Sequence, residues 1–156
     1  MLVDADFRNP QQHAVFGLPL DRGLCDIVRG QAALEEVVQA TPAEGLWILP
    51  AGRFDSAVMQ AISGPILAQT MDRLTEQFDF VILDSGPVLT GPGAIICGQY
   101  VDAAVLSTRR DVSRLPKVEE AYRRLQSVGI YVIGSVVNST KSDVRVNQIA
   151  LTSAQD

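Results

Sequence analysis

Apolar and polar positions alternate in blocks along the 156-residue chain. Short and nearly continuous apolar runs, typical of strands buried on both faces, recur at Leu2–Ala5, Leu46–Leu49, Phe80–Leu83, Ala103–Ser107 and Tyr131–Val137. Between them lie segments with apolar residues at helical spacing, at 25–30, 33–39, 64–78 and 113–129. Strands that alternate with helices predict an α/β fold in which helices flank a mostly parallel sheet.

The two long helical segments carry the clearest signals. In the segment 64–78, one side is formed by apolar residues that recur every three or four positions: Ile66, Leu67, Met71, Leu74 and Phe78. In the segment 113–129, Ser113 is expected to cap the start and Gly129 to end the helix. Pro116 falls in the first turn, where the missing N–H costs little.

Composition narrows the class of protein. One domain with a sizeable core is predicted over residues 1–138, followed by a polar tail at 139–156 without a period. The net charge of -5 argues against a nucleic-acid partner. Cys25, Cys97 and the single His13 lack the spacing of a zinc site and fit a reducing cytoplasm. No apolar stretch approaches the roughly 20 residues of a membrane helix, so a partner is expected to supply any contact with the inner face of the membrane.

Polar residues end three of the predicted strands. Asp4 and Asp6 end the first, Asp84 the third and Asn138 the last. In open α/β sheets ligands bind beyond the carboxyl ends of the strands, and carboxylates there suit Mg²⁺ held together with water and phosphate. Each of Asp6 and Asp84 taken alone is explained more simply as a cap of the following helix, whereas the set together favours a metal site.

The residues resemble a known family at this point. "LVDADFR" resembles the Walker A′ motif, and "FDFVILDSGPVL" the Walker B motif, of bacterial tyrosine kinases from capsule and exopolysaccharide loci. These kinases are deviant P-loop ATPases related to the MinD/ParA group. The "FGL…GL.D…G" spacing, "GLWILPAG" and "VGIYVIGSVVN" extend the resemblance from Met1 to Asn138. The resemblance implies a P-loop NTPase-like fold.

The resemblance also implies roles for individual residues, with ATP and Mg²⁺ as cofactors. Asp4 and Asp6 match the Walker A′ acids, which help to position Mg²⁺ and the incoming tyrosine hydroxyl, and one of them could accept the phenolic proton. Asp84 matches the Walker B acid, which holds Mg²⁺ through water. Arg8 matches a family arginine for which contact with phosphate and packing of the loop are both open. Asn138 matches a position that meets adenine in related ATPases.

The sequence departs from the family in its phosphate-binding loop. The family carries a glycine-rich loop ending in Gly-Lys-Ser/Thr before Walker A′, but Lys117 and Lys141, the two lysines here, follow no glycine. The fold is therefore expected to lack the P-loop strand and the first helix, and the chain alone is expected to bind Mg-ATP very weakly. A miscalled start, a truncated gene or one half of a split protein would each account for this.

Three functions follow from these observations. The first is the carboxyl-terminal majority of an ATP-dependent protein-tyrosine kinase of polysaccharide export, inactive until joined to its missing N-terminal segment. The second is a non-catalytic pseudo-ATPase module that docks on a membrane polysaccharide co-polymerase or on a true kinase as a regulator. The third and weakest is a MinD/ParA-type ATPase. Each of the three functions is compatible with a homo-oligomer.

Overall fold

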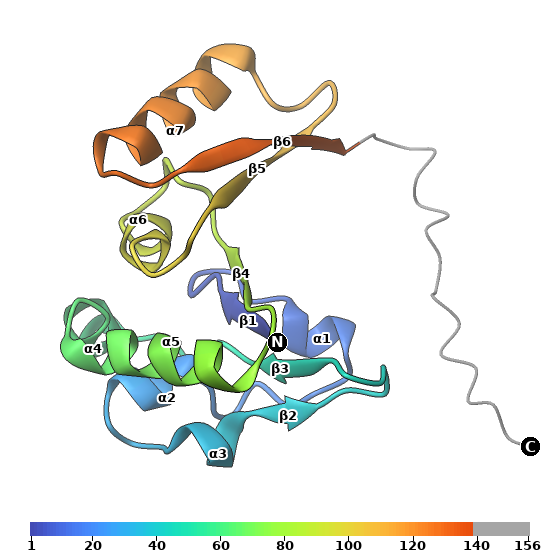
Figure 1. Ribbon diagram of the computed structural model, residues 1–156, viewed down its shortest axis with the longest axis vertical. Coiled ribbons are helices and arrows are strands. Elements are labelled where there is room, and N and C mark those ends of the chain that lie inside the picture. Colours follow the sequence, from blue (N-terminus) through green and yellow to red (C-terminus); the bar gives the residue numbers. More distant parts are fainter. Residues whose placement is uncertain (139–156) are drawn as a thin grey trace, which may run out of the picture. The chain divides into compact units, whose positions relative to one another are not determined.

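The computed structural model describes residues 1–138, which fall into two compact units (Figure 1). The first unit spans Met1–Tyr100, and the second begins at Val101. The elements of the first unit are β1 (Leu2–Ala5), α1 (Gln12–Val15), α2 (Leu24–Val28), α3 (Leu34–Val37), β2 (Gln39–Ala40), β3 (Trp47–Leu49), α4 (Ser56–Ala61), α5 (Pro65–Gln77), β4 (Ile82–Ser85) and α6 (Gly93–Gly98). Those of the second are β5 (Ala104–Arg109), α7 (Leu115–Ser127) and β6 (Val132–Asn138). The tail predicted at 139–156 lies outside the described residues.

The sheet of the first unit has the strand order β2-β3-β1-β4. β1 runs parallel to both β3 and β4, which confirms the predicted parallel arrangement, and the unpredicted β2 joins antiparallel to β3. β4 begins at Ile82 rather than at the predicted Phe80, because its ladder follows β1, whose first paired residue is Leu2. Asp4 lies opposite Asp84 in this register, so the carboxyl ends of the two strands are aligned.

The core of the first unit lies between its sheet and its helices. The predicted apolar side of α5 is confirmed, since Leu67 and Leu74 are fully buried and Met71 nearly so. α5 contacts α2, and α2 in turn contacts β1. Both cysteines, Cys25 and Cys97, are buried here, and burial raises the pKa of each thiol to about 12. Neither thiol is therefore an activated nucleophile at neutral pH.

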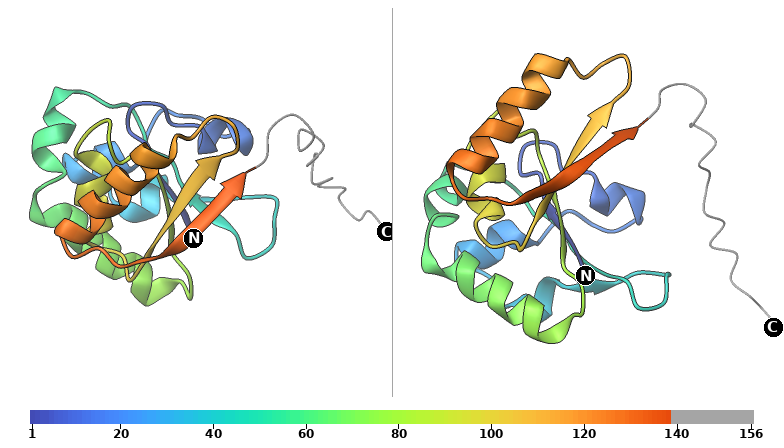
Figure 2. Two further views of the ribbon diagram at one scale, coloured as in Figure 1. Left: turned by 90° about the horizontal axis from the view of Figure 1, so that it is seen from above. Right: turned by 45° about the horizontal axis from the view of Figure 1, so that its top comes forward.

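The second unit is a β5–α7–β6 segment in which the two strands pair in parallel (Figure 2). Pro116 lies in the first turn of α7, and Gly129 follows the helix with φ +81°, as the sequence predicts. The predicted cap is wrong, because α7 begins after Arg114 and the Ser113 hydroxyl accepts a hydrogen bond from the Arg109 N–H instead. A serine before a helix can satisfy the preceding turn rather than the helix.

Each unit has a strand that pairs on one edge within residues 1–138. β4 pairs with β1, and β5 pairs with β6. Apolar side chains are exposed on both strands, with Ile82 63% and Val105 53% accessible to solvent. An exposed apolar edge strand is a template for pairing with another strand.

None of the helices within residues 1–138 has the length and apolar character needed to cross a membrane.

Candidate functional site

Asp4 is a fully buried carboxylate in β1 that organises the loop after the strand. Its Oδ2 accepts the N–H groups of Gln11 and Gln12, each at 3.0 Å, and its Oδ1 accepts that of Asp6 at 3.2 Å. Burial raises the pKa of Asp4 and the nearby Asp84 raises it further, while the three backbone N–H groups act in the opposite direction. Asp4 therefore fixes both the start of α1 and the residue that follows β1.

Asp6 directly follows β1 and is less buried than Asp4. Its Oδ1 accepts the N–H groups of Arg8 at 3.2 Å and Asn9 at 3.1 Å, whereas its Oδ2 accepts no hydrogen bond from the described residues. Gly86, which follows β4, passes so close that a Cβ added there would lie 2.9 Å from Asp6 Oδ1. A glycine at 86 is therefore needed for the Asp6 carboxylate to occupy this position.

Asp84 lies in β4 beside Asp4 in the register of the two strands. Its Oδ2 accepts a hydrogen bond from Gln12 Nε2 at 2.5 Å, and its Oδ1 has no hydrogen-bond donor in residues 1–138. Gln12 thus joins α1 to both strands, through its backbone to Asp4 and through its side chain to Asp84. Sequence reasoning missed Gln12, because an amide in a short polar segment carries no periodic signal.

The ends of β1 and β4 are the candidate place for a magnesium ion. Within residues 1–138, no three side chains of His, Cys, Asp or Glu lie close enough together to hold a metal ion by themselves. Asp6 Oδ2 and Asp84 Oδ1 are nevertheless oxygens without a hydrogen-bond donor among the described residues. Mg²⁺ is ordinarily bound by one or two carboxylates together with waters and phosphates, so these oxygens fit an ion that arrives with a nucleotide. The metal role of Asp4, Asp6 and Asp84 stays a prediction.

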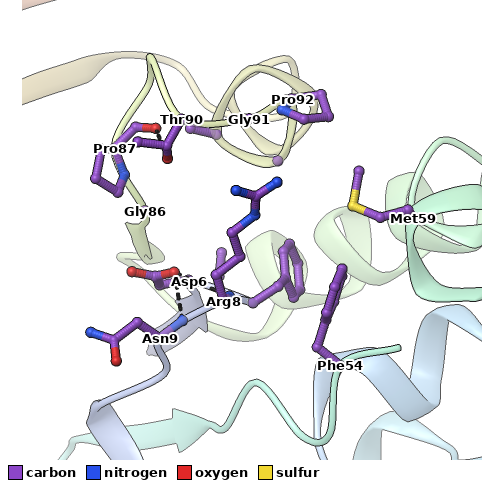
Figure 3. Close-up of a pocket in the computed structure, with 14 residues that line it drawn as sticks. Asp6, Arg8, Asn9, Phe54, Met59, Gly86, Pro87, Thr90, Gly91 and Pro92 are labelled. Carbon is purple, nitrogen blue, oxygen red and sulfur yellow. Dashed lines mark hydrogen bonds between the residues drawn. The ribbon is translucent and has the colours of Figure 1, made fainter. Parts of the chain in front are cut away.

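The other two candidate residues have well-defined surroundings. The Arg8 side chain extends from the loop after β1 toward Gly91 and Pro92 (Figure 3). Asn138 ends β6 in the second unit, where its Nδ2 donates to Ser107 Oγ at 2.9 Å. The expected contacts of Arg8 with phosphate and of Asn138 with adenine stay predictions.

A pocket of about 430 Å³ lies beside Asp6 in the first unit (Figure 3). Three segments line it, at 5–9, at 54 and 59, and at 86–94. Phe7 and Phe54 stack on one side with ring centroids 6.3 Å apart. Sequence reasoning missed this pocket, since Phe54 and Met59 are separated from both motifs along the chain and carry no chemical group that would single them out.

No model of a known protein family matches the sequence. The tyrosine-protein kinase ptk of Acinetobacter johnsonii is 28% identical over 138 residues, which cover 88% of this chain and 19% of that kinase. The solved kinase domain of VpsO is 26% identical and has a TM-score of 0.83, over 90% of this chain and 70% of that one. The chain is homologous to bacterial tyrosine kinases. This relationship confirms the resemblance expected from the Walker A′ and Walker B motifs.

The wider fold relationship is confirmed as well. The septum site-determining protein MinD of Pyrococcus horikoshii, solved with Mg-ADP, is 25% identical with a TM-score of 0.70. That match covers 88% of this chain and 56% of the MinD chain. The fold is therefore the predicted P-loop NTPase-like α/β fold. The chain spans 19% of the length of the kinase ptk and 63% of the length of the putative tyrosine-protein kinase CapB of Staphylococcus aureus.

Proposed function

We propose that this chain is the larger, carboxyl-terminal part of an ATP-dependent protein-tyrosine kinase domain that acts in capsule or exopolysaccharide production. The observation that carries the proposal is the register of β1 with β4, which aligns Asp4 with Asp84 and brings Gly86 against Asp6. The homology to bacterial tyrosine kinases supports the reaction class.

The proposal gives the three carboxylates different roles. Asp4 is buried and its two oxygens accept backbone N–H groups, so it positions the loop. Asp84 keeps Oδ1 for a magnesium ion or its bound water, whereas Asp6 keeps Oδ2 for the hydroxyl of the acceptor. A bound Mg²⁺ would neutralise the phosphate charge that develops during transfer.

Asp6 is also the proposed general base. In the proposed reaction the phenolic oxygen of a tyrosine attacks the γ-phosphorus of ATP, the bond from that phosphorus to the β–γ bridging oxygen breaks, and ADP leaves. The phenolic proton passes to Oδ2 of Asp6, which has no hydrogen-bond donor among residues 1–138. Asp4 is less suited to this step, because it is fully buried behind the loop that it holds.

In this kinase, phosphate is bound by a Gly-Lys-Ser/Thr loop on a segment outside residues 1–156. The printed sequence contains no Gly-Lys pair. The edge of β4 that faces away from β1 supports this assignment, because a strand carrying such a loop could pair there. The proposed partner in assembly is therefore a strand, loop and helix in the same polypeptide or in a second one.

Adding that segment tests the proposal. Two proteins are titrated with Mg-ATP by calorimetry. One is the 156-residue chain, and the other is a fusion that adds a strand, a Gly-rich Gly-Lys-Thr loop and a helix at its N-terminus. We expect weak binding by the chain and at least tenfold tighter binding by the fusion. The fusion is then incubated with Mg-ATP and a tyrosine peptide, and phosphotyrosine is measured by mass spectrometry. Removal of the base in Asp6→Asn should lower the rate by about 100-fold or more.

The outcomes separate the parts of the proposal. Submicromolar binding of Mg-ATP by the 156-residue chain alone would overturn the assignment of phosphate binding to another segment. An unchanged rate in Asp6→Asn would overturn the assignment of the base, with Asp21→Asn as the control at an exposed aspartate paired to Arg53. A folded fusion that binds Mg-ATP without transferring phosphate would favour the non-catalytic docking module.

A further inference from the structure

The pocket beside Asp6 has the chemical character of a binding site for a side chain. Its volume of about 430 Å³ falls within the range of pockets that hold small ligands. Its apolar wall is formed mainly by Phe7, Phe54, Met59, Pro87 and Pro92. Its polar groups are the Asp6 carboxylate and the Arg8 guanidinium, which come from the same loop after β1. An aromatic ring with one polar end would match this distribution.

Two glycines lie against the pocket residues Arg8 and Phe7 on the side of the 86–94 segment. A Cβ added at Gly91 would lie 3.3 Å from Arg8 Nη2, and one added at Gly93 would lie 3.5 Å from the Phe7 ring. The segment therefore runs against the guanidinium and against the aromatic wall. Figure 3 shows the Arg8 side chain rising between this segment and the side of the pocket that holds Phe54 and Met59.

Arg8 differs from the other arginines of the first unit in its charge partners. Arg22, Arg29, Arg53 and Arg73 each form an ion pair with an aspartate or a glutamate. Arg8 forms no ion pair with any of the described residues, although Asp6 is only two positions away. The Asp6 carboxylate instead accepts the backbone N–H of Arg8. An exposed guanidinium at the rim of an apolar pocket is suited to bind an anion that belongs to a ligand.

We propose that this pocket selects the acceptor of the kinase. The ring of a substrate tyrosine lies against Phe7, Phe54 and Met59, and Arg8 binds a carboxylate of an aspartate or glutamate next to that tyrosine. This inference rests on the proposed function and adds the substrate class, which is a tyrosine in an acidic segment. The carboxylate fits Arg8 well, because a planar guanidinium can bind both of its oxygens at once.

Peptide binding to the full 156-residue chain tests this proposal without any phosphoryl transfer. Labelled peptides with a central tyrosine and flanking aspartates, serines or lysines are titrated by fluorescence anisotropy. We expect the acidic peptide to bind at least tenfold more tightly than the lysine peptide. In Arg8→Gln this preference should fall to less than threefold, whereas Arg22→Gln, at an exposed arginine paired with Glu36, should keep it. Arg8→Lys keeps the charge without the fork and should give an intermediate preference.

The aromatic wall is tested in the same assay. Phe54→Ala should lower the affinity for all three tyrosine peptides by about the same factor. Replacement of the peptide tyrosine by alanine should do the same. Met59→Ala serves as a second variant at this wall, and thermal melting followed by circular dichroism identifies the variants that fold. A preference for the acidic peptide that persists in folded Arg8→Gln, or tyrosine binding that is unchanged in folded Phe54→Ala and Met59→Ala, would overturn the proposal.

Arg8 could bind the phosphate of a nucleotide instead of a peptide carboxylate, and a further titration distinguishes these anions. In the fusion that carries a Gly-Lys-Thr loop, Arg8→Gln should leave the affinity for Mg-ATP unchanged, and a tenfold loss would overturn the peptide assignment. If the fusion phosphorylates all three peptides at equal rates and binds them with equal affinities, the selection of acidic peptides is overturned and the proposed kinase function stands. If acidic peptides bind in an Arg8-dependent way but are not phosphorylated, the proposed kinase function is overturned and the proposed binding site stands.

Discussion

The two units bury their apolar residues to very different extents. In the first unit, β1 lies between two strands, and residues such as Val3, Leu24 and Leu74 are completely buried. In the second unit, the buried apolar residues within the described part are Leu125 and Ile130. Both units are built mainly from parallel strands and helices, so the difference lies in how much of each sheet is covered.

This difference follows from what a parallel sheet requires. Parallel strands are ordinarily buried on both faces, and their apolar runs reflect that. β5 and β6 have such runs, yet Val105, Ile133 and Val136 are each more than half exposed. A two-stranded sheet with a single helix cannot cover all of these side chains. We therefore expect the first unit to contribute most of the folding free energy of this chain.

The largest expected effect compares two leucines on helices of equal length. α5 and α7 each have 13 residues, and Leu74 is fully buried whereas Leu115 is 77% exposed. Leu74→Ala should lower the free energy of unfolding by about 3 kcal/mol, because it leaves a cavity in the core. Leu115→Ala should change it by less than about 0.5 kcal/mol. Urea unfolding followed by fluorescence of Trp47, the single tryptophan, provides the measurement.

A circular-dichroism signal recorded in the same titration serves as the control, because it also reports the helix of the second unit. If Leu115→Ala costs as much as Leu74→Ala, the apolar surface of α7 is covered in solution. The contrast between the two units would then be wrong.

A smaller effect is expected from the charges that pack around α2. Arg29 binds Asp26 Oδ1 at 2.8 Å and Asp55 Oδ2 at 2.5 Å, with 15% of its side chain exposed. Arg29→Met should cost about 2 kcal/mol, because it leaves the buried Asp26 carboxylate without its charged partner. The matched change in the second unit is Arg123→Met, which removes an exposed pair with Glu119 and should cost less than about 0.5 kcal/mol. Equal losses in the two variants, measured by urea unfolding, would contradict this assignment.

The sequence predicted those elements that its own periodicity defines. The strands at β1, β3, β5 and β6 lie within one or two residues of their apolar runs, and α5 follows its helical spacing. Among the short helices, α2 and α3 overlap the predicted segments 25–30 and 33–39, whereas α1, α4 and α6 escaped prediction. Helices of four to six residues depend largely on contacts that lie elsewhere in the chain. For α1 that contact is the Asp4 carboxylate, which lies seven residues before Gln11.

The candidate site divides in the same way. The apolar runs predicted that Asp4, Asp6 and Asp84 lie where strands end, and the structure has them at the ends of β1 and β4, which pair with each other. The contact between Gln12 and Asp84 and the pocket at Arg8 could not be predicted, because each joins segments that are far apart in the chain. Their formation depends on packing that no single stretch of sequence encodes.

The smallest expected effect concerns the starts of two helices and depends on pH. Asp55 Oδ1 accepts the N–H groups of Ala57 and Val58 and so caps α4, whereas Ser113 does not cap α7. The N–H of Val58 first, and Arg29 in addition, lower the pKa of Asp55 below its ordinary value. A lowered pKa in the folded state stabilises the protein above the unfolded pKa of about 3.9, and this contribution is lost as the pH falls through the folded value.

Asp55→Ala should therefore lower the melting temperature at pH 7, by less than Arg29→Met does, and the difference from the unchanged protein should shrink between pH 4 and pH 2. Part of the difference should remain in acid, because the protonated carboxyl can still accept a hydrogen bond at the start of α4. Asp55→Asn keeps a hydrogen-bond acceptor at the start of α4, so its melting temperature at pH 7 should fall by less than that of Asp55→Ala. Ser113→Ala should have little effect at either pH, since the hydroxyl serves an exposed turn. A loss in Asp55→Ala that is the same at pH 7 and pH 2 would assign the effect to packing rather than to the ionised cap.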